Sequence, residues 1–280
     1  MEITTLYTYF KECGRVTTDT RNCPEGSMFI ALKGETFNGN MFARQALEKG
    51  CRYAVVDEAE YADAPNIFLV DDCLKTLQML AREHRRALGT PIVGITGTNG
   101  KTTTKELIAT VLQKRYNVLY TQGNLNNHIG VPLTLLNLTE EHEMAVVEMG
   151  ANHPGEIRTL VNIAEPDCGL ITNVGKAHLE GFGSFEGVVK TKSELYDYLR
   201  SKENAFTFLD KDNEVLCQAS AGLETICYGL EGEELYVRGR LHACAPFLAF
   251  EWEHEGRTYD VNTHLIGAYN VKNALAAIAI

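Results

Sequence analysis

The sequence lacks the features that mark several classes of protein. No stretch approaches the roughly 20 consecutive apolar residues that a membrane-spanning helix needs. The first residues, Met1 to Thr5, lack the basic and apolar regions of a signal peptide. The eight cysteines include no Cys-x-x-Cys pair, which disfavours a disulfide scaffold and a zinc site. We therefore expect a cytoplasmic protein with reduced thiols and no membrane span.

Basic residues are scarce as well. The chain has 26 Lys and Arg against 37 Asp and Glu, a net charge of −11. This balance disfavours a protein that coats nucleic acid or an anionic membrane, although one focused site can still bind phosphates. No Asn-Lys dipeptide occurs, so the base-reading Asn-Lys-x-Asp motif of signalling GTPases is missing. With 280 residues, 45% of them hydrophobic, the chain favours two domains with ample core.

Strand and helix patterns alternate along the chain and divide it into two parts. A helix-like run ends at Leu88-Gly89-Thr90-Pro91, and the Gly and Pro there predict a domain boundary. In residues 1–88, short apolar segments alternate with amphipathic helical patterns, which predicts a small α/β domain.

The second part, residues 89–280, contains a longer alternation. The segments 91–96, 144–148 and 169–173 are short and nearly all apolar, as strands are in a parallel sheet buried on both faces. From about residue 236 to 262 the pattern changes to alternating strands. The expected fold class is therefore α/β, with a mostly parallel sheet and a small antiparallel flap.

Two helical patterns of the second part lead to further expectations. One face of a helix that begins at Lys101 is marked by Leu107, Ile108, Val111 and Leu112. The sequence stops at Ile280 inside an apolar helical pattern with no capping residue. We expect from this that the chain is truncated within its last helix.

A glycine-rich segment joins the strand 91–96 to the helix from Lys101. Thr96-Gly-Thr-Asn-Gly-Lys-Thr-Thr103 has the composition of a phosphate-binding loop, because glycines let successive N–H groups face one anion. Lys101 adds positive charge near the β- and γ-phosphates, and the Thr102 hydroxyl can ligate Mg²⁺. The common GxxxxGK[ST] spacing would require glycine at Ile95, so this is a variant loop. A plain glycine-rich turn is the alternative interpretation.

Two residues that follow later strands are candidate metal ligands. Glu148 ends the strand 144–148, and a carboxylate at that end of a strand is well placed to hold Mg²⁺ beside a phosphate loop. His178 follows the strand near 169–173 and is a candidate second ligand. The alternatives are a solvated glutamate at a strand end and an ordinary surface histidine.

Lys192 lies where a lysine is unexpected. Ser184 is a candidate N-cap, and Val188, Lys192, Leu195 and Leu199 then recur at helical spacing, so Lys192 falls on an apolar stripe while Lys190 faces water. A buried lysine is costly unless it is paired, neutralised or chemically modified. The alternative is that its stem reaches along the surface to water.

These segments resemble the ATPase domain of the Mur ligase family and of the related folylpolyglutamate synthases. The matching stretches are residues 96–103, Glu148-Met-Gly150, Thr172-Asn-Val-Gly-x-Ala-His178-Leu and Lys192-Ser-Glu-Leu-Tyr196. Gly267-Ala-Tyr-Asn270-Val-Lys-Asn273 is similar to the segment on the adenine side of that superfamily's nucleotide site.

Three further stretches indicate a branch of the family. Thr18-Asp-Thr-Arg21, with Pro24 to Gly34, resembles a uridine-binding domain, although Asp-Ser-Arg is commoner there than Asp-Thr-Arg. Gly123-Asn-Leu-Asn-Asn127-His-Ile-Gly and Glu148 to Ile157 are similar to the branch that joins D-alanyl-D-alanine to UDP-N-acetylmuramoyl-tripeptide. The resemblance implies a third domain that would hold the dipeptide, and we expect it to lie outside these 280 residues.

The resemblance implies a role for individual residues. Residues 1–88 would form the UDP-substrate domain and residues 89–280 the ATPase domain. The metal ligands would be Thr102, Glu148, His178 and a carbamylated Lys192, with two Mg²⁺ sites; Lys101, Glu148, His178 and Lys192 would be catalytic. Nucleotide would be bound by Gly97, Thr98, Asn99, Gly100, Lys101, Thr102, Thr103, Asn270 and Asn273. The UDP-linked substrate would be bound by Thr20, Arg21, Lys33, Asn126 and Asn127.

The implied reaction is ATP-dependent amide formation through an acyl phosphate, in the cytoplasmic part of peptidoglycan synthesis. The expected protein is a monomer that binds neither nucleic acid nor membrane. Two alternatives stay open: a sibling ligase, either diamino-acid-adding or similar to folylpolyglutamate synthase, and a nucleotide-binding module without ligase activity. We expect the 280 residues alone to bind nucleotide without completing ligation.

Overall fold

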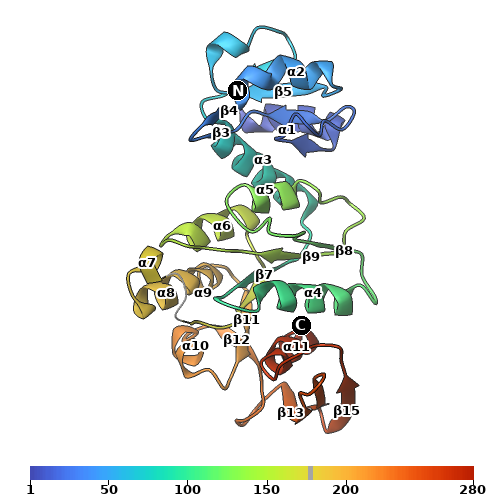
Figure 1. Ribbon diagram of the computed structural model, residues 1–280, viewed down its shortest axis with the longest axis vertical. Coiled ribbons are helices and arrows are strands. Elements are labelled where there is room, and N and C mark those ends of the chain that lie inside the picture. Colours follow the sequence, from blue (N-terminus) through green and yellow to red (C-terminus); the bar gives the residue numbers. More distant parts are fainter. Residues whose placement is uncertain (176–178) are drawn as a thin grey trace. The chain divides into compact units, whose positions relative to one another are not determined.

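The structure is a computed structural model of the chain, which describes residues 1–175 and 179–280, with the backbone only at residues 179 and 180. The chain forms two compact units, whose elements are labelled in Figure 1. The first unit comprises Met1–Gly89 and His128–Glu140, and the second comprises Thr90–Asn127 and Glu141–Ile280. The chain therefore leaves the second unit once, at His128–Glu140, and then returns to it. This excursion is not part of the division into 1–88 and 89–280 that the sequence suggested.

The first unit is built on a four-stranded parallel sheet in the order β1-β2-β5-β6. The strands are β1 (Val16–Thr17), β2 (Met28–Ile30), β5 (Tyr53–Val56) and β6 (Ile67–Leu69). The other elements are α1 (Ile3–Cys13), a short hairpin of β3 (Lys33–Gly34) and β4 (Phe37–Asn38), the 3₁₀ turns η1 (Gly39–Phe42) and η2 (Ala59–Tyr61), α2 (Ala43–Glu48), α3 (Cys73–Leu88) and α5 (Gly130–Leu135). This agrees with the predicted small α/β domain.

Helix α3 explains why the excursion belongs to the first unit. Its N-cap Asp72 accepts a hydrogen bond from the Lys75 amide, and it ends at Gly89, whose φ of 67° is the left-handed value that favours glycine. One face of α3 packs on α1, and α5 packs on α3 as well. His84 of α3 is buried and its Nε2 lies 2.9 Å from the Leu138 carbonyl. The segment after α5 is thereby bonded to the first unit.

The second unit contains a nine-stranded sheet in the order β15-β14-β13-β12-β11-β10-β7-β9-β8. The strands from β8 to β13 pair in parallel, whereas β13, β14 and β15 pair antiparallel. The strands are β7 (Ile92–Thr96), β8 (Val118–Tyr120), β9 (Met144–Glu148), β10 (Cys168–Ile171), β11 (Phe206–Asp210), β12 (Glu224–Gly229), β13 (Val237–Ala243), β14 (Ala249–His254) and β15 (Arg257–Asn262). The predicted parallel sheet and antiparallel flap are confirmed, and the flap continues the sheet through β12 and β13.

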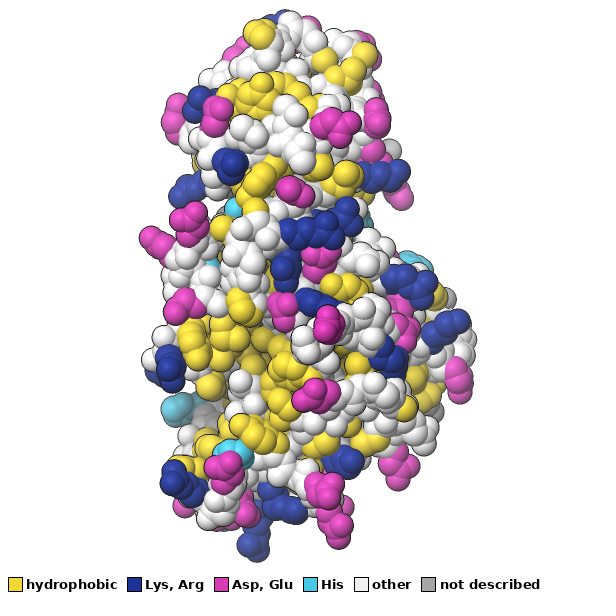
Figure 2. Space-filling model, turned by 180° about the vertical axis from the view of Figure 1, so that it is seen from behind, with side chains coloured by type: hydrophobic (Ala, Val, Ile, Leu, Met, Phe, Trp, Pro, Cys, Tyr) yellow, Lys and Arg dark blue, Asp and Glu magenta, His cyan; other side chains and the backbone are white. Residues whose placement is uncertain are grey.

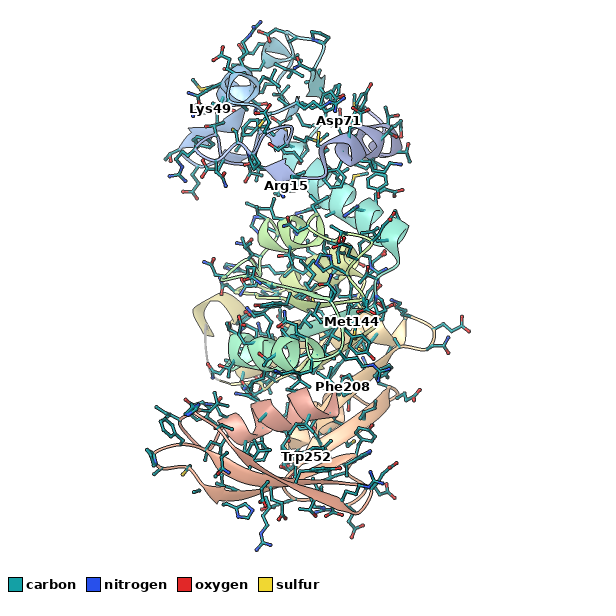
Figure 3. All side chains as sticks on the ribbon, turned by 90° about the vertical axis from the view of Figure 1, so that its right-hand side faces the viewer. Arg15, Lys49, Asp71, Met144, Phe208 and Trp252 are labelled. Carbon is teal, nitrogen blue, oxygen red and sulfur yellow. The ribbon has the colours of Figure 1, made fainter. Side chains whose placement is uncertain are left out.

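Helices cover the parallel part of this sheet. They are α4 (Lys101–Leu112), α6 (Glu156–Ala164), α7 (Leu179–Phe182), α8 (Phe185–Lys192), α9 (Glu194–Arg200), α10 (Glu214–Ala219) and α11 (Asn270–Ala279). Phe208 of β11 and Trp252 of β14, labelled in Figure 3, belong to one hydrophobic cluster with the inner face of α11. Burying such apolar surface is the main favourable contribution to folding.

The buried face of α4 differs from the predicted one. Ile108 and Leu112 are buried as expected, but Val111 is 45% exposed. The face toward the sheet instead includes Thr104 and Lys105, both 0% exposed. The apolar spacing did not indicate this, because Lys105 is bonded to the Thr121 carbonyl, which lies 16 residues further along the chain.

The surface agrees with the mixed composition. On the face shown in Figure 2, acidic and basic side chains are interspersed over the surface. Within the described part of the chain, no helix combines the length and the apolar character needed to cross a membrane.

Candidate nucleotide and metal site

The loop between β7 and α4 has the backbone that its glycines allow. Gly97 has a φ of 145° and Gly100 a φ of 77°, both in the region that L side chains rarely adopt. A Cβ at Gly97 would collide with the Thr172 hydroxyl, and a Cβ at Gly100 would lie 2.9 Å from Asn273 Oδ1. Both positions therefore need glycine for conformation and for space.

The end of the neighbouring strand β10 fixes this loop. The amides of Thr98 and Asn99 donate to the backbone and side-chain oxygens of Asn173, at 2.9 and 3.0 Å. In return, the Thr172 hydroxyl donates to the Asn99 carbonyl at 2.7 Å, and the Gly175 amide donates to Thr98 Oγ1 at 2.9 Å. Since β7 and β10 are parallel neighbours, their carboxyl ends meet, which is where open α/β sheets bind ligands. The Thr-Asn-Val-Gly stretch thus has a role that its spacing alone did not reveal.

Lys101 lies at the start of α4 and is folded over the loop. Its Nζ donates to the carbonyls of Gly97 and Thr98, at 2.8 and 3.1 Å. Burial lowers the pKa of Lys101, and the charge of Glu148 opposes that shift. An amine held on two neutral carbonyls can move onto a phosphate oxygen, which offers a charge-assisted hydrogen bond. Thr103, the last residue of the predicted loop, is half-buried in the same turn.

Glu148 is the best-defined candidate metal ligand. It is 1% exposed, and its Oε1 lies 3.3 Å from the Thr102 hydroxyl and 2.8 Å from Asn126 Nδ2. Its other oxygen, Oε2, is buried and has no hydrogen-bond partner among the described residues. A buried oxygen of this kind is rare in folded proteins, and carboxylate and hydroxyl oxygens are the ligands that Mg²⁺ prefers. The residues present therefore fit a divalent cation beside the phosphate loop.

Asn126 contacts the metal ligand. Besides donating to Glu148, Asn126 accepts a hydrogen bond from the Gly150 amide at 2.8 Å through its backbone carbonyl. Its predicted substrate contact is not tested by these bonds, but they show that it fixes the Glu148 carboxylate. The neighbouring Asn127 is exposed at the end of the same loop.

Lys192 occupies the apolar stripe that its spacing predicts. Ser184 caps α8 by accepting from the Gly187 amide, Lys192 is 3% exposed, and Lys190 faces solvent, as predicted. Lys192 Nζ donates to the Ala151 carbonyl at 3.2 Å and lies 5.3 Å from the centre of the Phe182 ring. Burial, followed by the charge of Lys101, lowers the pKa of Lys192 to about 8.

The Glu194 carboxylate holds the segment that faces Lys192, a role that sequence reasoning missed. Glu194 is 5% exposed and accepts from the amides of Gly155 at 3.0 Å and Arg158 at 2.8 Å, which caps the N-terminus of α6. Glu156 accepts from the Asn152 amide at 2.6 Å. The two carboxylates fix the loop that presents the Ala151 carbonyl. The only signal in the sequence was the position of Glu194 two residues after Lys192.

The asparagines of α11 lie beside the loop. Asn270 and Asn273 are 6% and 7% exposed, and Asn273 Nδ2 donates to Asn270 Oδ1 at 2.8 Å. Asn273 is also the residue nearest to Gly100. The structure thus brings the predicted adenine-side segment and the predicted phosphate loop together. His178 lies outside the described residues.

Two of the three predicted substrate residues of the first unit, Arg21 and Lys33, form ion pairs with carboxylates. Arg21 is 88% exposed in its side chain and pairs with Asp19 at 2.7 Å, and its guanidinium holds the pKa of Asp19 at about 2. Lys33 pairs with Asp57 at 2.9 Å and with Glu58 at 3.3 Å. The Thr20 carbonyl accepts from Lys49 Nζ at 2.7 Å.

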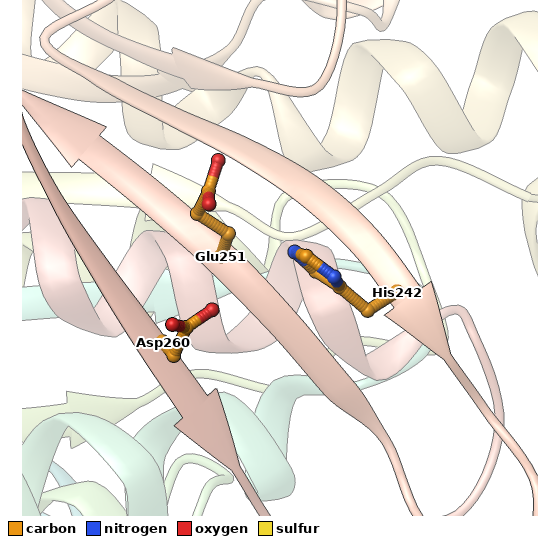
Figure 4. Close-up of side chains that lie close together, drawn as sticks. All are labelled: His242, Glu251 and Asp260. Atoms are coloured by element: carbon orange, nitrogen blue, oxygen red, sulfur yellow. The ribbon is translucent and has the colours of Figure 1, made fainter.

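Another cluster among the described residues has the composition of a metal site. His242, Glu251 and Asp260 lie on the adjacent strands β13, β14 and β15, with ligand atoms within 4.8 Å of one another (Figure 4). His242 and Asp260 are exposed and Glu251 is half-buried. Glu251 and Asp260 are direct partners in the register of β14 and β15, which by itself brings their side chains together. The sheet register thus accounts for the contact of Glu251 with Asp260, whereas His242 lies at the register shift between Leu241 and Ala243.

These features define an α/β protein with a candidate nucleotide-binding site, in which a variant phosphate loop lies beside a buried carboxylate. The Mur ligase middle domain matches residues 95–280, and the catalytic domain of the Mur ligase family matches residues 13–85. The chain belongs to the Mur ligase family.

Individual relatives indicate one branch of the family. The chain is 40% identical over 266 residues to the UDP-N-acetylmuramoyl-tripeptide–D-alanyl-D-alanine ligase of Bacillus subtilis. The matched region covers 94% of this chain and 57% of that protein. The chain is 38% identical to the protein of the same name from Escherichia coli, covering 95% and 59%. The chain thus spans under three-fifths of the length of these curated relatives.

Solved structures agree with this similarity. A crystal structure of MurF from Acinetobacter baumannii superposes with a TM-score of 0.86 at 31% identity, covering 99% of this chain and 63% of that one. MurF from Thermotoga maritima in complex with ADP superposes with a TM-score of 0.84 at 32% identity, covering 94% and 61%.

Proposed function

We propose that this chain carries the UDP-substrate domain (1–88) and the ATPase domain (89–280) of a ligase that joins D-alanyl-D-alanine to UDP-N-acetylmuramoyl-tripeptide. The protein acts as a cytoplasmic monomer in peptidoglycan synthesis. The names of the Bacillus subtilis and Escherichia coli relatives support the choice of substrates. The observation that carries the proposal is the buried Glu148 carboxylate beside a phosphate loop: its Oε1 contacts Thr102, and its Oε2 has no hydrogen-bond partner among the described residues. It provides a place for the cation that accompanies ATP.

The first chemical step forms an acyl phosphate. An oxygen of the terminal carboxylate of the tripeptide attacks the γ-phosphorus of ATP. A bond forms between this oxygen and the γ-phosphorus, and the bond from the γ-phosphorus to the bridging oxygen breaks, so that ADP leaves. The loop amides and Lys101 bind the phosphate oxygens, where Lys101 exchanges its two carbonyl acceptors for a phosphate. Thr102 and Glu148 would hold one Mg²⁺ ion, and Glu148 with His178 would hold a second. When bound, these ions neutralise charge that develops on the phosphates.

The second step forms the amide. The amino group of D-alanyl-D-alanine attacks the acyl carbon, the tetrahedral intermediate expels phosphate, and the amine loses a proton. No side chain of the protein needs to act as a nucleophile, because most of the rate enhancement comes from positioning and electrostatics. Asn270 and Asn273, beside the loop, would bind the adenine side of the nucleotide.

Lys192 is the proposed carbamylated residue. Its lowered pKa, about 8, increases the fraction of neutral amine at physiological pH, and the neutral amine is the form that attacks CO₂. The product is an anionic carbamate with oxygens that can face a metal ion. The positive charge of Lys101, which disfavours the Lys192 cation, favours this anion.

The first unit binds the UDP part of the substrate through Thr20, Arg21 and Lys33, and Asn126 and Asn127 of the second unit are further proposed substrate-binding residues. Arg21 and Lys33 already form ion pairs with Asp19 and Asp57, so a diphosphate would compete with these carboxylates for the two cations. The guanidinium of Arg21 suits this exchange because it can bind two phosphate oxygens at once.

Calorimetry with the 280-residue chain tests the proposal. UDP-N-acetylmuramoyl-tripeptide should bind at least about tenfold more tightly than the corresponding dipeptide, and ADP should bind more tightly with Mg²⁺ than with EDTA. Preference for the dipeptide would favour a diamino-acid-adding sibling ligase. A chain that binds ADP but binds neither UDP-linked precursor would be a simple nucleotide-binding module, and this result would contradict the proposal.

A further inference from the structure

A second buried lysine, Lys105, has no role in the proposed chemistry. It is 0% exposed, although its neighbours in sequence are the threonines of the phosphate loop and the exposed Glu106. Its Nζ donates to the Thr121 carbonyl at 2.6 Å and lies 2.9 Å from Glu106 Oε1. The ring of Tyr120 lies 5.6 Å away. Burying an ammonium group is costly unless its bonds compensate. The groups bonded to Lys105 Nζ therefore indicate which parts of the structure this side chain holds in place.

Thr121 connects Lys105 to the metal ligand. Its carbonyl accepts from Lys105, its hydroxyl accepts from the Glu148 amide at 2.9 Å, and its own amide donates to the Val146 carbonyl at 3.0 Å. It follows β8 directly, and β8 is the edge strand of the sheet with β9 as its only strand neighbour among the described elements. A bond from α4 therefore adds a second attachment at the end of this strand.

The loop that begins at Thr121 also carries Asn126. Glu148 Oε1 thus accepts from two sides: from Thr102 on α4 and from Asn126 on the loop. Lys105 lies three residues after Thr102, on the same face of α4, and bonds to the first residue of the loop. A single side chain therefore joins the two elements that orient the carboxylate.

We propose that Lys105 is a positioning residue for the metal site: through Thr121 it fixes the 121–126 loop against α4, so that Thr102, Asn126 and Glu148 keep their relative positions. This inference rests on the proposed function, in which Glu148 and Thr102 bind Mg²⁺. Residues outside the ligand set that orient ligands commonly change metal affinity by about 10- to 100-fold.

The test compares ADP binding with and without Mg²⁺ in four single variants and in the Lys105→Met/Thr121→Val double variant. Lys105→Met keeps an unbranched side chain, one atom shorter than that of lysine, and removes its donors. Thr121→Val removes the hydroxyl that accepts from Glu148. Glu106→Gln is the matched control, because it removes the exposed ion-pair partner of Lys105 and leaves the bond to Thr121 intact. Glu148→Gln tests the metal site itself.

Lys105→Met should raise the Mg²⁺ concentration for half-maximal ADP binding about tenfold, with ADP affinity in EDTA changed less than about twofold. Thr121→Val should act in the same direction, and the double variant should be less than additive. Amide hydrogen exchange without metal should be faster at Glu148 in Lys105→Met than in Glu106→Gln.

Two outcomes contradict the inference. A folded Lys105→Met with the wild-type Mg²⁺ requirement would overturn it, and so would a variant that loses ADP affinity equally with and without Mg²⁺, since that is a general structural role. If Glu148→Gln also leaves the Mg²⁺ requirement unchanged, the metal site of the proposed function fails. If only Glu148→Gln raises the requirement, the positioning role of Lys105 alone fails.

Discussion

The two units of the molecule present their candidate ligand groups in opposite ways. In the second unit, Glu148 and Lys192 are buried, and the phosphate loop is bonded to the end of β10. In the first unit, Arg21 is almost fully exposed, and it and Lys33 already pair with carboxylates. Glu148, Lys192 and the loop backbone of the second unit are held by buried contacts before any ligand arrives, whereas Arg21 and Lys33 of the first unit are held only by ion pairs at the surface.

This difference affects how each site responds to mutation. Removing a buried, bonded group leaves its partners without hydrogen bonds, and that loss extends to stability. Exposed ion pairs contribute little to stability, so their removal affects mainly the ligand. The comparison therefore predicts that variants of the second unit change binding or folding strongly, while variants of the first change affinity alone.

The largest expected effect is on nucleotide binding by Lys101→Ala. ADP affinity should fall at least about 100-fold, because the phosphates lose a cationic partner. The melting temperature should change little, because Lys101 is only half-buried and its Nζ bonds to two loop carbonyls and to no core group. Calorimetry measures the affinity, and Lys190→Ala, which changes an exposed lysine, is the control. Unchanged ADP affinity in a folded Lys101→Ala would remove the phosphate-loop assignment.

A loss of stability is expected from Glu194→Ala. The amides of Gly155 and Arg158 lose their acceptor at the start of α6, which should lower the free energy of unfolding by about 2 kcal/mol. Urea unfolding measures this change, and the exposed Glu203→Ala should leave the midpoint in place. Equal midpoints for the two variants would show that the carboxylate is not a structural cap.

In the first unit, Arg21→Ala should weaken binding of UDP-N-acetylmuramoyl-tripeptide about tenfold and leave the melting temperature unchanged. Arg44→Ala removes another exposed ion pair of the same unit, with Asp63, and should change neither quantity. A lower melting temperature for Arg21→Ala with unchanged affinity would reverse the proposed contrast between the units.

The sequence predicted the parts of the fold that follow local periodicity. The apolar stripe through Val188, Lys192 and Leu195 and the Ser184 cap were correct because both depend on helical spacing alone. Lys105 was not found, since it follows three threonines and precedes a glutamate, and only the long-range contact with Thr121 buries it. The excursion of residues 128–140 into the first unit was missed for the same reason: it depends on the packing of α5 against α3.

The smallest expected effect is a dependence of stability on pH at Lys192. Its pKa in the folded protein, about 8, lies below the ordinary value of 10.5, so the unfolded state binds more protons between these values. In buffer free of CO₂, the free energy of unfolding should therefore rise between pH 7 and 8.5, by less than about 1 kcal/mol. Lys192→Met should lack this part of the slope, and an identical slope in both proteins would contradict the lowered pKa.

The most direct test of the account is amide NMR of the chain with each ligand in turn. ADP with Mg²⁺ should shift the amides of residues 97–103 together with Glu148, Asn270 and Asn273, and leave Thr18 to Gly39 in place. UDP-N-acetylmuramoyl-tripeptide should shift Thr18 to Gly39. If ADP with Mg²⁺ shifts no amide between residues 97 and 103, the preformed nucleotide site, and the function proposed from it, are wrong.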